Sequence, residues 1–357
     1  MPSIARHIVG GNEPSLVSRI ALNPIFTGAV VILLRGVPEH VRNNLLARLS
    51  ISAKHDLSLP TTLATALFAF SVARWFNAKL SDVSANAGRW STPKGWHWPK
   101  EIALVTGGCS GIGQCIVANL VAKGVRVAIL DVQELPAPFQ KNPKIRLYKC
   151  DITDSEAVAA AASQVRSDLG HPTILINNAG ITKSHGILDA PQGEVDKIFA
   201  VNTISHWITA KEFVPNMVKT NHGHIVTIAS VASFVALPKF AEYSATKAAA
   251  LSFHESLTVE LKHIYNAPNV MTTVIHPNFV STPLISNIED GLTKQGVPLL
   301  TPEFVATKVT NQIFSKRAGQ VIIPQGSTAV SGIRAWPVWL QNTLRDFIGK
   351  RHAALTA

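Results

Sequence analysis

The stretch that decides the fold is Thr106-Gly107-Gly108-Cys109-Ser110-Gly111-Ile112-Gly113. It follows a short apolar, β-branched run at 101–106, typical of a buried parallel strand, and precedes a helical run that ends at Gly124. Gly107 permits the sharp turn after the strand. Gly111 and Gly113 let backbone approach a pyrophosphate and let the next helix lie close to the strand. Because a helix N-terminus attracts anions, the stretch predicts a dinucleotide cradle.

An acidic residue at the end of the next strand indicates which dinucleotide fits. The apolar run 125–130 ends at Asp131, 18 positions after Gly113. A carboxylate at about this spacing accepts hydrogen bonds from the adenosine ribose hydroxyls of NAD. It would repel a 2′-phosphate, and neither Val132 nor Gln133 supplies a cation. We therefore expect NAD, with NADP as the alternative.

A second constellation carries acid/base chemistry. Ser230 follows the apolar run 224–229, and Tyr243 and Lys247 lie four residues apart on one face of a predicted helix over 241–263. The Lys247 ammonium is expected to lower the phenol pKa of Tyr243 from its usual value near 10. Tyr243 could then exchange a proton with an alcohol or carbonyl oxygen while a hydride passes to or from nicotinamide, and Ser230 would hydrogen-bond that oxygen.

Together these motifs resemble the short-chain dehydrogenase/reductase family over about residues 97–325. Further matches are Asp151, Asn177-Asn178-Ala179-Gly180 and Asn202. The resemblance implies that Asp151 contacts adenine and that Asn202 holds a water that relays protons through Lys247. It implies four catalytic residues, Ser230, Tyr243, Lys247 and Asn202. The implied cofactor-binding residues are Gly107, Ser110, Gly111, Ile112, Gly113, Asp131, Asp151, Asn178, Ala179, Gly180, Tyr243, Lys247, Val280 and Thr282. The family usually has Pro-Gly where this chain has Pro277-Asn278, and we expect Asn278 to preserve the turn by tolerating left-handed backbone.

Alternating strands and helices predict a Rossmann-type, doubly wound α/β fold with a seven-stranded parallel sheet. The expected strands are 101–106, 125–130, 145–150, 173–177, 224–229, 270–275 and 320–323. Helices are expected from Asp154 or Ser155 to about 169, over 194–214 and 241–263, and from 302 with Thr301 as its cap. Residues 281–300 have no strong period and are expected to form a substrate lid with an apolar lining of Pro283, Leu284, Ile285 and Leu292.

Residues 1–96 are expected to form a hydrophobic, basic helical extension, joined through a linker at 91–95. Residues 1–100 hold 11 Lys and Arg against 4 Asp and Glu, a net of +7 out of +11 for the chain. The uncharged stretches 20–34 and 57–73 are short or borderline for a bilayer span. We favour a monotopic membrane anchor over one short tilted span or a soluble helical cap. Trp75, Trp90, Trp96 and Trp98 would be interfacial aromatics, or would pack the junction with the catalytic domain.

The remaining features bound the function. Residues 326–357 form a C-terminal tail whose segment 333–348 is compatible with an amphipathic helix against a membrane or a channel mouth. Three cysteines without paired spacing favour a reducing compartment. The basic charge comes without a nucleic-acid motif, so no nucleic-acid partner is expected. His222 and His224 lack metal-ligand spacing and are expected at the surface, so no metal site is predicted.

The sequence therefore predicts an NAD(P)-dependent enzyme acting on CH–OH groups, with Tyr243 as general acid/base. Resemblance to membrane-attached members of the family, which act on retinol or 17-beta-hydroxysteroids, implies a lipophilic alcohol, ketone or aldehyde of retinoid, steroid or lipid type. The alternatives are a biosynthetic ketoreductase on a polyketide-like or acyl substrate and a catalytically silent, nucleotide-binding lipid carrier or scaffold. The expected location is a membrane surface, at the endoplasmic reticulum or a lipid droplet, with the catalytic domain facing the cytosol. The sequence leaves homo-oligomerisation open.

Overall fold

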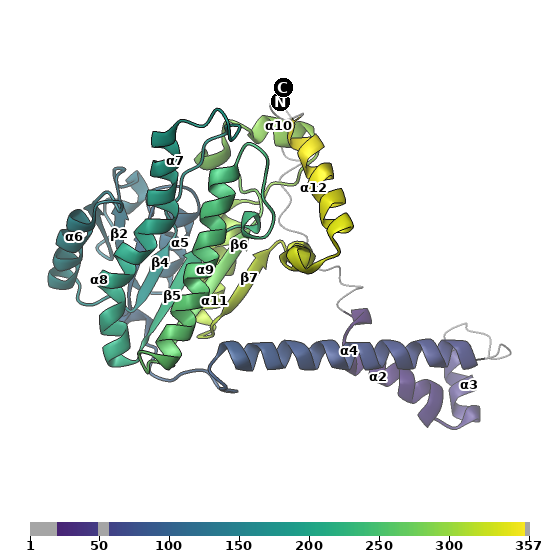
Figure 1. Ribbon diagram of the computed structural model, residues 1–357. Coiled ribbons are helices and arrows are strands. Elements are labelled where there is room, and N and C mark those ends of the chain that lie inside the picture. The colour runs from purple at the N-terminus through teal and green to yellow at the C-terminus, as the bar shows by residue number, and fades with distance from the viewer. Residues whose placement is uncertain (1–19, 49–56, 354–357) are drawn as a thin grey trace. The chain divides into compact units, whose positions relative to one another are not determined.

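The computed structural model describes residues 20–48 and 57–353, and within them a seven-stranded sheet dominates (Figure 1). Its strands are β1 (Ile102–Thr106), β2 (Arg126–Asp131), β3 (Ile145–Lys149), β4 (Ile174–Asn177), β5 (Gly223–Ile228), β6 (Val270–Pro277) and β7 (Gly319–Ile323). All neighbours are parallel, in the order β3-β2-β1-β4-β5-β6-β7. The predicted doubly wound sheet is confirmed, and each strand was expected to within two residues at either end.

Helices cover both faces of the sheet because its central strands are apolar on both sides. On one face, α5 (Gly111–Ala122) and α11 (Pro302–Phe314) pack against each other and the sheet. The other face carries α6 (Ser155–Asp168), α8 (Ser205–Thr220) and α9 (Ala241–His263), whose apolar side chains join Leu104, Leu175 and Ile225 in a second core. All residues of β1, β4, β5 and β6 are buried, so the sheet places the carboxyl ends of its strands rigidly at one edge.

Local capping signals set several helix ends as expected. Asp154 caps α6, accepting from the backbone N–H groups of Glu156 and Ala157. Thr301 caps α11 by accepting from Phe304, with Pro302 at the first helical position. Gly124, at φ +90°, follows the C-cap of α5.

The helix expected over 194–214 is interrupted. It consists of α7 (Gln192–Phe199), a π-helical turn (Ala200–Ile204) and α8, which continues to Thr220. The expected lid over 281–300 contains a 3-10 turn (Pro283–Ile285) and α10 (Glu289–Lys294). The π-helical turn contains no Pro or Gly, so tertiary packing decides that break, whereas the 3-10 turn in the lid begins at Pro283.

The structure decides two expectations about aromatic and histidine side chains. Trp96 is buried in the core, with its ring centroid 5.3 Å from that of Trp98 and 4.3 Å from that of His222, so it packs inside the catalytic unit and is not an interfacial aromatic. His224, expected at the surface, is fully buried on β5 and lies 2.8 Å from the Thr273 hydroxyl. β5 is an inner strand whose residues are all buried, so the position of His224 in the sheet buries this side chain despite its polarity.

The C-terminal segment forms a 3-10 stretch (Gln325–Ala335) followed by α12 (Val338–Ala353). Trp336, Leu344 and Ile348 pack with Ile333 against Val231 and Phe234. The tail therefore covers part of the catalytic unit.

A separate compact unit spans Glu13–Gly88, while Arg89 already belongs to the unit that contains the sheet. Its described helices are α2 (Pro24–Val31), a π turn (Ile32–Gly36), α3 (Glu39–Arg48) and α4 (Ser58–Ala85). α2 lies against α4, with Gly28 so close to Phe68 that a Cβ at Gly28 would lie 3.0 Å from the ring. Across residues 20–48 and 57–353, the structure contains no helix with both the length and the apolar character needed to cross a bilayer.

Candidate active site

The turn after β1 is tied to the end of β4. The Thr106 hydroxyl accepts from the backbone N–H groups of Asn178 and Ala179, both at 3.0 Å. In return, Asn178 Nδ2 donates to the carbonyls of Thr106 and Gly107, also at 3.0 Å. These four bonds join two strands that are adjacent in the sheet but about 70 residues apart in sequence, and they fix the crevice at the carboxyl edge of the sheet.

The glycine turn fits a dinucleotide phosphate. Gly107 has φ +65°, and a Cβ at Gly113 would lie 2.1 Å from the Gly107 carbonyl oxygen, so neither position tolerates a larger residue without rearrangement. The Ser110 side chain makes no capping bond at the N-terminus of α5, and the first intrahelical bond runs from Gln114 N–H to Ser110. The first N–H groups of this helix therefore remain available for an anion.

Asp131 lies beside this turn, at the end of β2. One carboxylate oxygen accepts from Cys109 N–H at 2.9 Å and the other from Gln133 N–H at 3.0 Å, and the residue is 6% exposed. Each oxygen retains a lone pair for a further donor. The carboxylate thus shapes the glycine turn, and both of its oxygens can still accept a hydrogen bond from a ligand.

Ser230, Tyr243 and Lys247 come together at the ends of β5 and α9. Ser230 is the second residue after β5 and caps a 3-10 turn, its hydroxyl accepting from Ala232 N–H at 3.1 Å. Lys247 is buried, its Nζ donating to the Ile228 carbonyl at 2.8 Å and lying 5.7 Å from the Tyr243 ring centroid. The structure thus brings the three predicted residues to one side of a single cavity.

The electrostatics correct one expectation. Burial raises the pKa of Tyr243 above its ordinary value, and a hydrogen bond with Ser230 opposes this increase. Burial also lowers the pKa of Lys247 to about 8. The expected lowering of the phenol pKa by Lys247 was wrong for this structure, because desolvation dominates and the ammonium lies beside the ring while donating to a carbonyl.

Asn202 lies behind the cavity, in the π-helical turn. Its amide forms two bonds with Ile181, accepting from the backbone N–H at 2.8 Å and donating to the carbonyl at 2.9 Å, and Nδ2 also approaches the Thr246 hydroxyl at 3.1 Å. A Cβ at Gly180 would lie 3.4 Å from Asn202 Oδ1 and 3.5 Å from Lys247 Nζ. Asn202 and Lys247 are therefore neighbours across Gly180, and the water relay between them stays a prediction.

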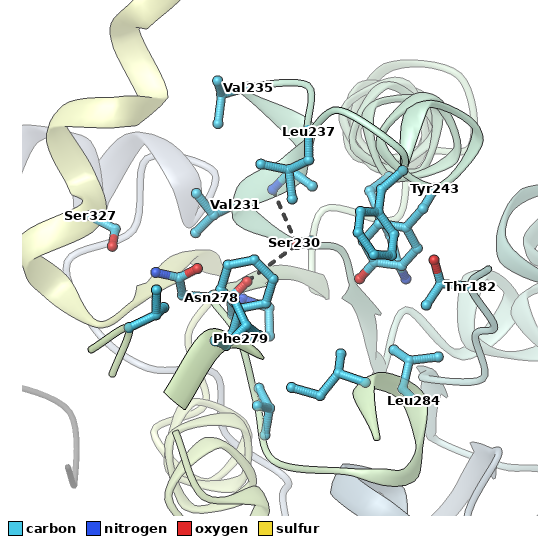
Figure 2. Close-up of a pocket in the computed structure, with 18 of the residues that line it drawn as sticks. Thr182, Ser230, Val231, Val235, Leu237, Tyr243, Asn278, Phe279, Leu284 and Ser327 are labelled. Carbon is cyan, nitrogen blue, oxygen red and sulfur yellow. Dashed lines mark hydrogen bonds between the residues drawn. The ribbon is translucent and has the colours of Figure 1, made fainter. Parts of the chain in front are cut away.

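The cavity measures about 320 Å³ and has a mostly apolar lining. Figure 2 shows Thr182, Ser230 and Tyr243 directed into it, with Phe279 and Leu284 on another side. Its walls come from the ends of β5 and β6, the loop between Ser230 and Tyr243, the segment 282–297 and the C-terminal helix. The chain can therefore hold an apolar molecule against a hydroxyl, a phenol and an ammonium.

The predicted site residues divide into two groups. Those that line the cavity are Ile112, Asn178, Gly180, Ser230, Tyr243, Lys247, Val280 and Thr282. The others lie around the glycine turn or behind the wall: Gly107, Ser110, Gly111, Gly113, Asp131, Ala179 and Asn202. Asp151 is exposed beyond β3 and accepts bonds from Thr153, so its adenine contact stays a prediction.

The predicted apolar lining from segment 281–300 is correct in part, and the role of this segment as a substrate lid stays a prediction. Leu284, Ile285 and Leu292 line the cavity, whereas Pro283 is not among its lining residues. Asn278 was wrongly expected in left-handed backbone: it is not among the positive-φ residues, and its N–H donates to the Ile323 carbonyl at 2.8 Å. A bond to β7 therefore replaces the conformational freedom of glycine at this turn.

Sequence reasoning missed several cavity residues. Val235, Leu237 and Phe240 come from the loop between Ser230 and Tyr243, and Thr182 follows the Asn-Asn-Ala-Gly motif. The apolar content of that loop was a usable signal. Leu344, Phe347 and Ile348 of α12 also line the cavity, consistent with the channel-mouth alternative for the tail.

Comparisons with known proteins agree with this geometry. A family model described as short chain dehydrogenase matches residues 101–293. The chain is 42% identical over 180 residues to dehydrogenase RED2 of Cochliobolus heterostrophus, covering 50% of this chain and 68% of that protein. It is 33% identical over 230 residues to human estradiol 17-beta-dehydrogenase 11, covering 63% and 75%. A solved short chain dehydrogenase/reductase from Burkholderia phymatum in complex with NAD shares the fold, with TM-score 0.61 and 23% identity over 68% of this chain and 95% of that one.

Proposed function

This chain belongs to the short-chain dehydrogenase family, and from that premise we propose that it oxidises a lipophilic alcohol or reduces the corresponding ketone or aldehyde, with Tyr243 as general acid/base. When bound, the nicotinamide dinucleotide supplies hydride acceptor or donor chemistry. The observation that supports this most is the convergence of Ser230, Tyr243 and Lys247 on one apolar cavity.

The side chains divide the proton chemistry between them. Tyr243 is held as a neutral phenol by burial, which suits it to donate a proton to a carbonyl oxygen. In the oxidation direction the phenolate form must accept the alcohol proton, and the Ser230 hydrogen bond favours that form. Lys247 would bind the cofactor and take part in the proton relay, and Ser230 would hydrogen-bond the reacting oxygen.

Turnover by the purified full chain tests the assignment. NADH formation is followed over primary and secondary aliphatic alcohols graded from butanol to hexadecanol, and NADH consumption over the matching carbonyls. We expect Tyr243→Phe to reduce kcat at least about a thousandfold while NADH binding, measured by fluorescence, stays within twofold. Retention of turnover by Tyr243→Phe would refute the role of Tyr243, and NADH binding with no turnover by wild type would favour a silent carrier.

For the cofactor, we propose NAD in preference to NADP. In this proposal the Asp131 carboxylate accepts from the ribose hydroxyls and would repel a 2′-phosphate. The side chain of Lys149, opposite Asp131 in the register of β2 and β3, pairs with Glu134. That cation is therefore already engaged by an acid. The test is the ratio of kcat/KM for the two dinucleotides, and a tenfold preference for NADP would refute the proposal.

The substrate class rests on the cavity lining. Apart from the catalytic end, most lining residues are apolar, and none of them carries a carboxylate. Transfer of an apolar surface from water contributes about 25 cal/mol per Å², so a longer alkyl chain should bind more tightly. We therefore expect KM to fall with alcohol chain length until the cavity is filled.

For location, we propose that Glu13–Gly88 holds the enzyme on a membrane surface. Large apolar side chains of this unit are exposed on more than one helix, among them Ile25, Leu59, Leu63, Phe70 and Phe76. The exposed basic residues Arg35 and Arg74 would suit anionic headgroups. Exposed apolar area of this extent would be unfavourable in water.

Flotation with vesicles of phosphatidylcholine and phosphatidylserine tests the anchor. Wild type should float, and the double variant Leu63→Glu with Phe70→Glu should remain at the bottom of the gradient. The matched control is Leu188→Glu on the catalytic unit, which is 98% exposed and should float like wild type. If both variants floated equally well, the membrane-binding surface would lie outside the apolar face that contains Leu63 and Phe70. If wild type failed to float, membrane binding would be excluded.

A further inference from the structure

Two consecutive residues of β6, His276 and Pro277, form hydrogen bonds with the backbone carbonyl and the side-chain hydroxyl of Ser230. The Ser230 carbonyl oxygen lies 3.0 Å from His276 Nδ1, and the Ser230 hydroxyl donates to the Pro277 carbonyl at 3.3 Å. The same hydroxyl accepts from Ala232 N–H. The orientation of Ser230 is therefore set from the neighbouring strand as well as by its own turn.

The surroundings of the His276 ring allow one neutral tautomer. A carbonyl oxygen can only accept, so Nδ1 carries the proton and donates to Ser230. Nε2 then accepts from the Gln320 amide nitrogen, which lies 3.1 Å away and can only donate. The ring is fully buried and packs on Phe234 with 4.5 Å between centroids, so it cannot rotate freely.

His276 does not contact the substrate space. It is absent from the residues that line the cavity, although Ser230 and Pro277 are among them. Burial first, and then the Lys247 charge, lower its pKa to about 4, while the bond to Ser230 opposes that lowering. The imidazole is therefore neutral at physiological pH and acts as a fixed donor.

We propose that His276 is a positioning residue, whose Nδ1–H fixes Ser230 so that its hydroxyl meets both the reacting oxygen and Tyr243. This inference rests on the proposed function, because it concerns the reaction that Ser230 and Tyr243 carry out. Ser230 is only partly buried and begins a turn, so its peptide can reorient when the donor is lost. Misplacement of a catalytic group by about 1 Å can cost about a hundredfold in rate.

Two substitutions at position 276 distinguish the loss of the hydrogen-bond donor from a change in side-chain volume. His276→Leu introduces an apolar side chain of similar size that has no N–H group. His276→Asn retains an amide N–H donor near the position of Nδ1. The matched control is His254→Leu, because His254 is also buried and its ring nitrogen lies 3.2 Å from a hydroxyl, but that hydroxyl belongs to Thr227 and not to Ser230. Each variant is assayed in the full chain with the best alcohol of the graded series.

We expect His276→Leu to reduce kcat by roughly ten- to a hundredfold, with KM and the dissociation constant for NADH within twofold of wild type. His276→Asn should recover kcat to within about threefold, and His254→Leu should leave it within threefold. In a Ser230→Ala background, His276→Leu should change kcat by less than twofold, because its effect runs through Ser230. Equal losses in His276→Leu and His254→Leu, or effects that multiply in the Ser230→Ala background, would overturn the proposal.

A measurement on the unaltered ring keeps the inference testable if His276→Leu does not fold. In ¹⁵N-histidine-labelled wild type, the resonances that vanish in His276→Asn should show a protonated Nδ1 and an unprotonated Nε2. The opposite tautomer would overturn the proposal. If Tyr243→Phe retains turnover, the proposed function fails instead, whereas full activity of His276→Leu beside an inactive Tyr243→Phe refutes this inference alone.

Discussion

Four buried histidines should make the catalytic unit sensitive to acid. His206, His224 and His276 are 2% exposed or less and His254 is 5% exposed. Burial is the first cause that lowers their pKa values, to about 3 for His206, His224 and His254 and to about 4 for His276. In the unfolded chain the pKa of each histidine is about 6.5.

The sign follows from linkage. Between the folded and unfolded pKa values the unfolded state binds more protons, so the free energy of unfolding falls as pH falls from about 6.5 towards 4. Each buried histidine costs up to about 1.4 kcal/mol per pH unit in this window. Lowering the pH from 6.5 to 4.5 should therefore cost about 2 kcal/mol for each and roughly 8 kcal/mol for all four. This is comparable to the whole stability of a typical domain.

The assay is urea unfolding followed by tryptophan fluorescence between pH 4.5 and 7.5. His206→Leu removes one of the four groups and keeps an apolar side chain beside Phe253, whose ring lies 5.6 Å from that of His206. Between pH 6.5 and 4.5, His206→Leu should lose about 2 kcal/mol less unfolding free energy than wild type does. His263→Leu, which alters an exposed histidine, should retain the wild-type slope. An unchanged slope in His206→Leu would refute the reasoning.

Three further predictions concern the site. Gly113→Ala should weaken NADH binding about ten- to a hundredfold, because the added Cβ would clash with the Gly107 carbonyl oxygen. The control is Gly326→Ala, whose added Cβ would have no heavy atom within 4 Å. Fluorescence titration with NADH measures both dissociation constants. The raised Tyr243 pKa predicts that kcat for alcohol oxidation rises from pH 7 to 10 while carbonyl reduction does not, so a flat oxidation profile would contradict it. Asp131→Ser should lower kcat/KM with NAD about tenfold and raise it with NADP, and steady-state kinetics that show an unchanged ratio would count against the ribose contact.

Much of the fold followed from local signals. Apolar β-branched runs located the seven strands, and Asp154, Thr301 and Gly124 marked helix ends that the structure confirms. These features act within a few residues, through backbone geometry and capping, so the chain alone specifies them. The spacing of Tyr243 and Lys247 on one helix likewise requires no tertiary information.

The electrostatics of the site could not be obtained this way. Proximity of an ammonium suggested a lowered pKa for Tyr243, but desolvation by residues distant in sequence raises it instead. The break in the helix around Asn202 and the wall contributed by α12 also depend on contacts across the sheet edge.

The amino-acid sequence by itself determined the parallel sheet, the glycine turn and the order of the site residues, because periodicity, propensity and short spacing express them directly. Only the tertiary structure decided that His276 supports Ser230, that Trp96 and His224 are buried, and that the C-terminal helix lines the cavity. Each of these depends on segments that meet in space after long intervals of chain, where burial and hydrogen-bond partners override the local character of a residue.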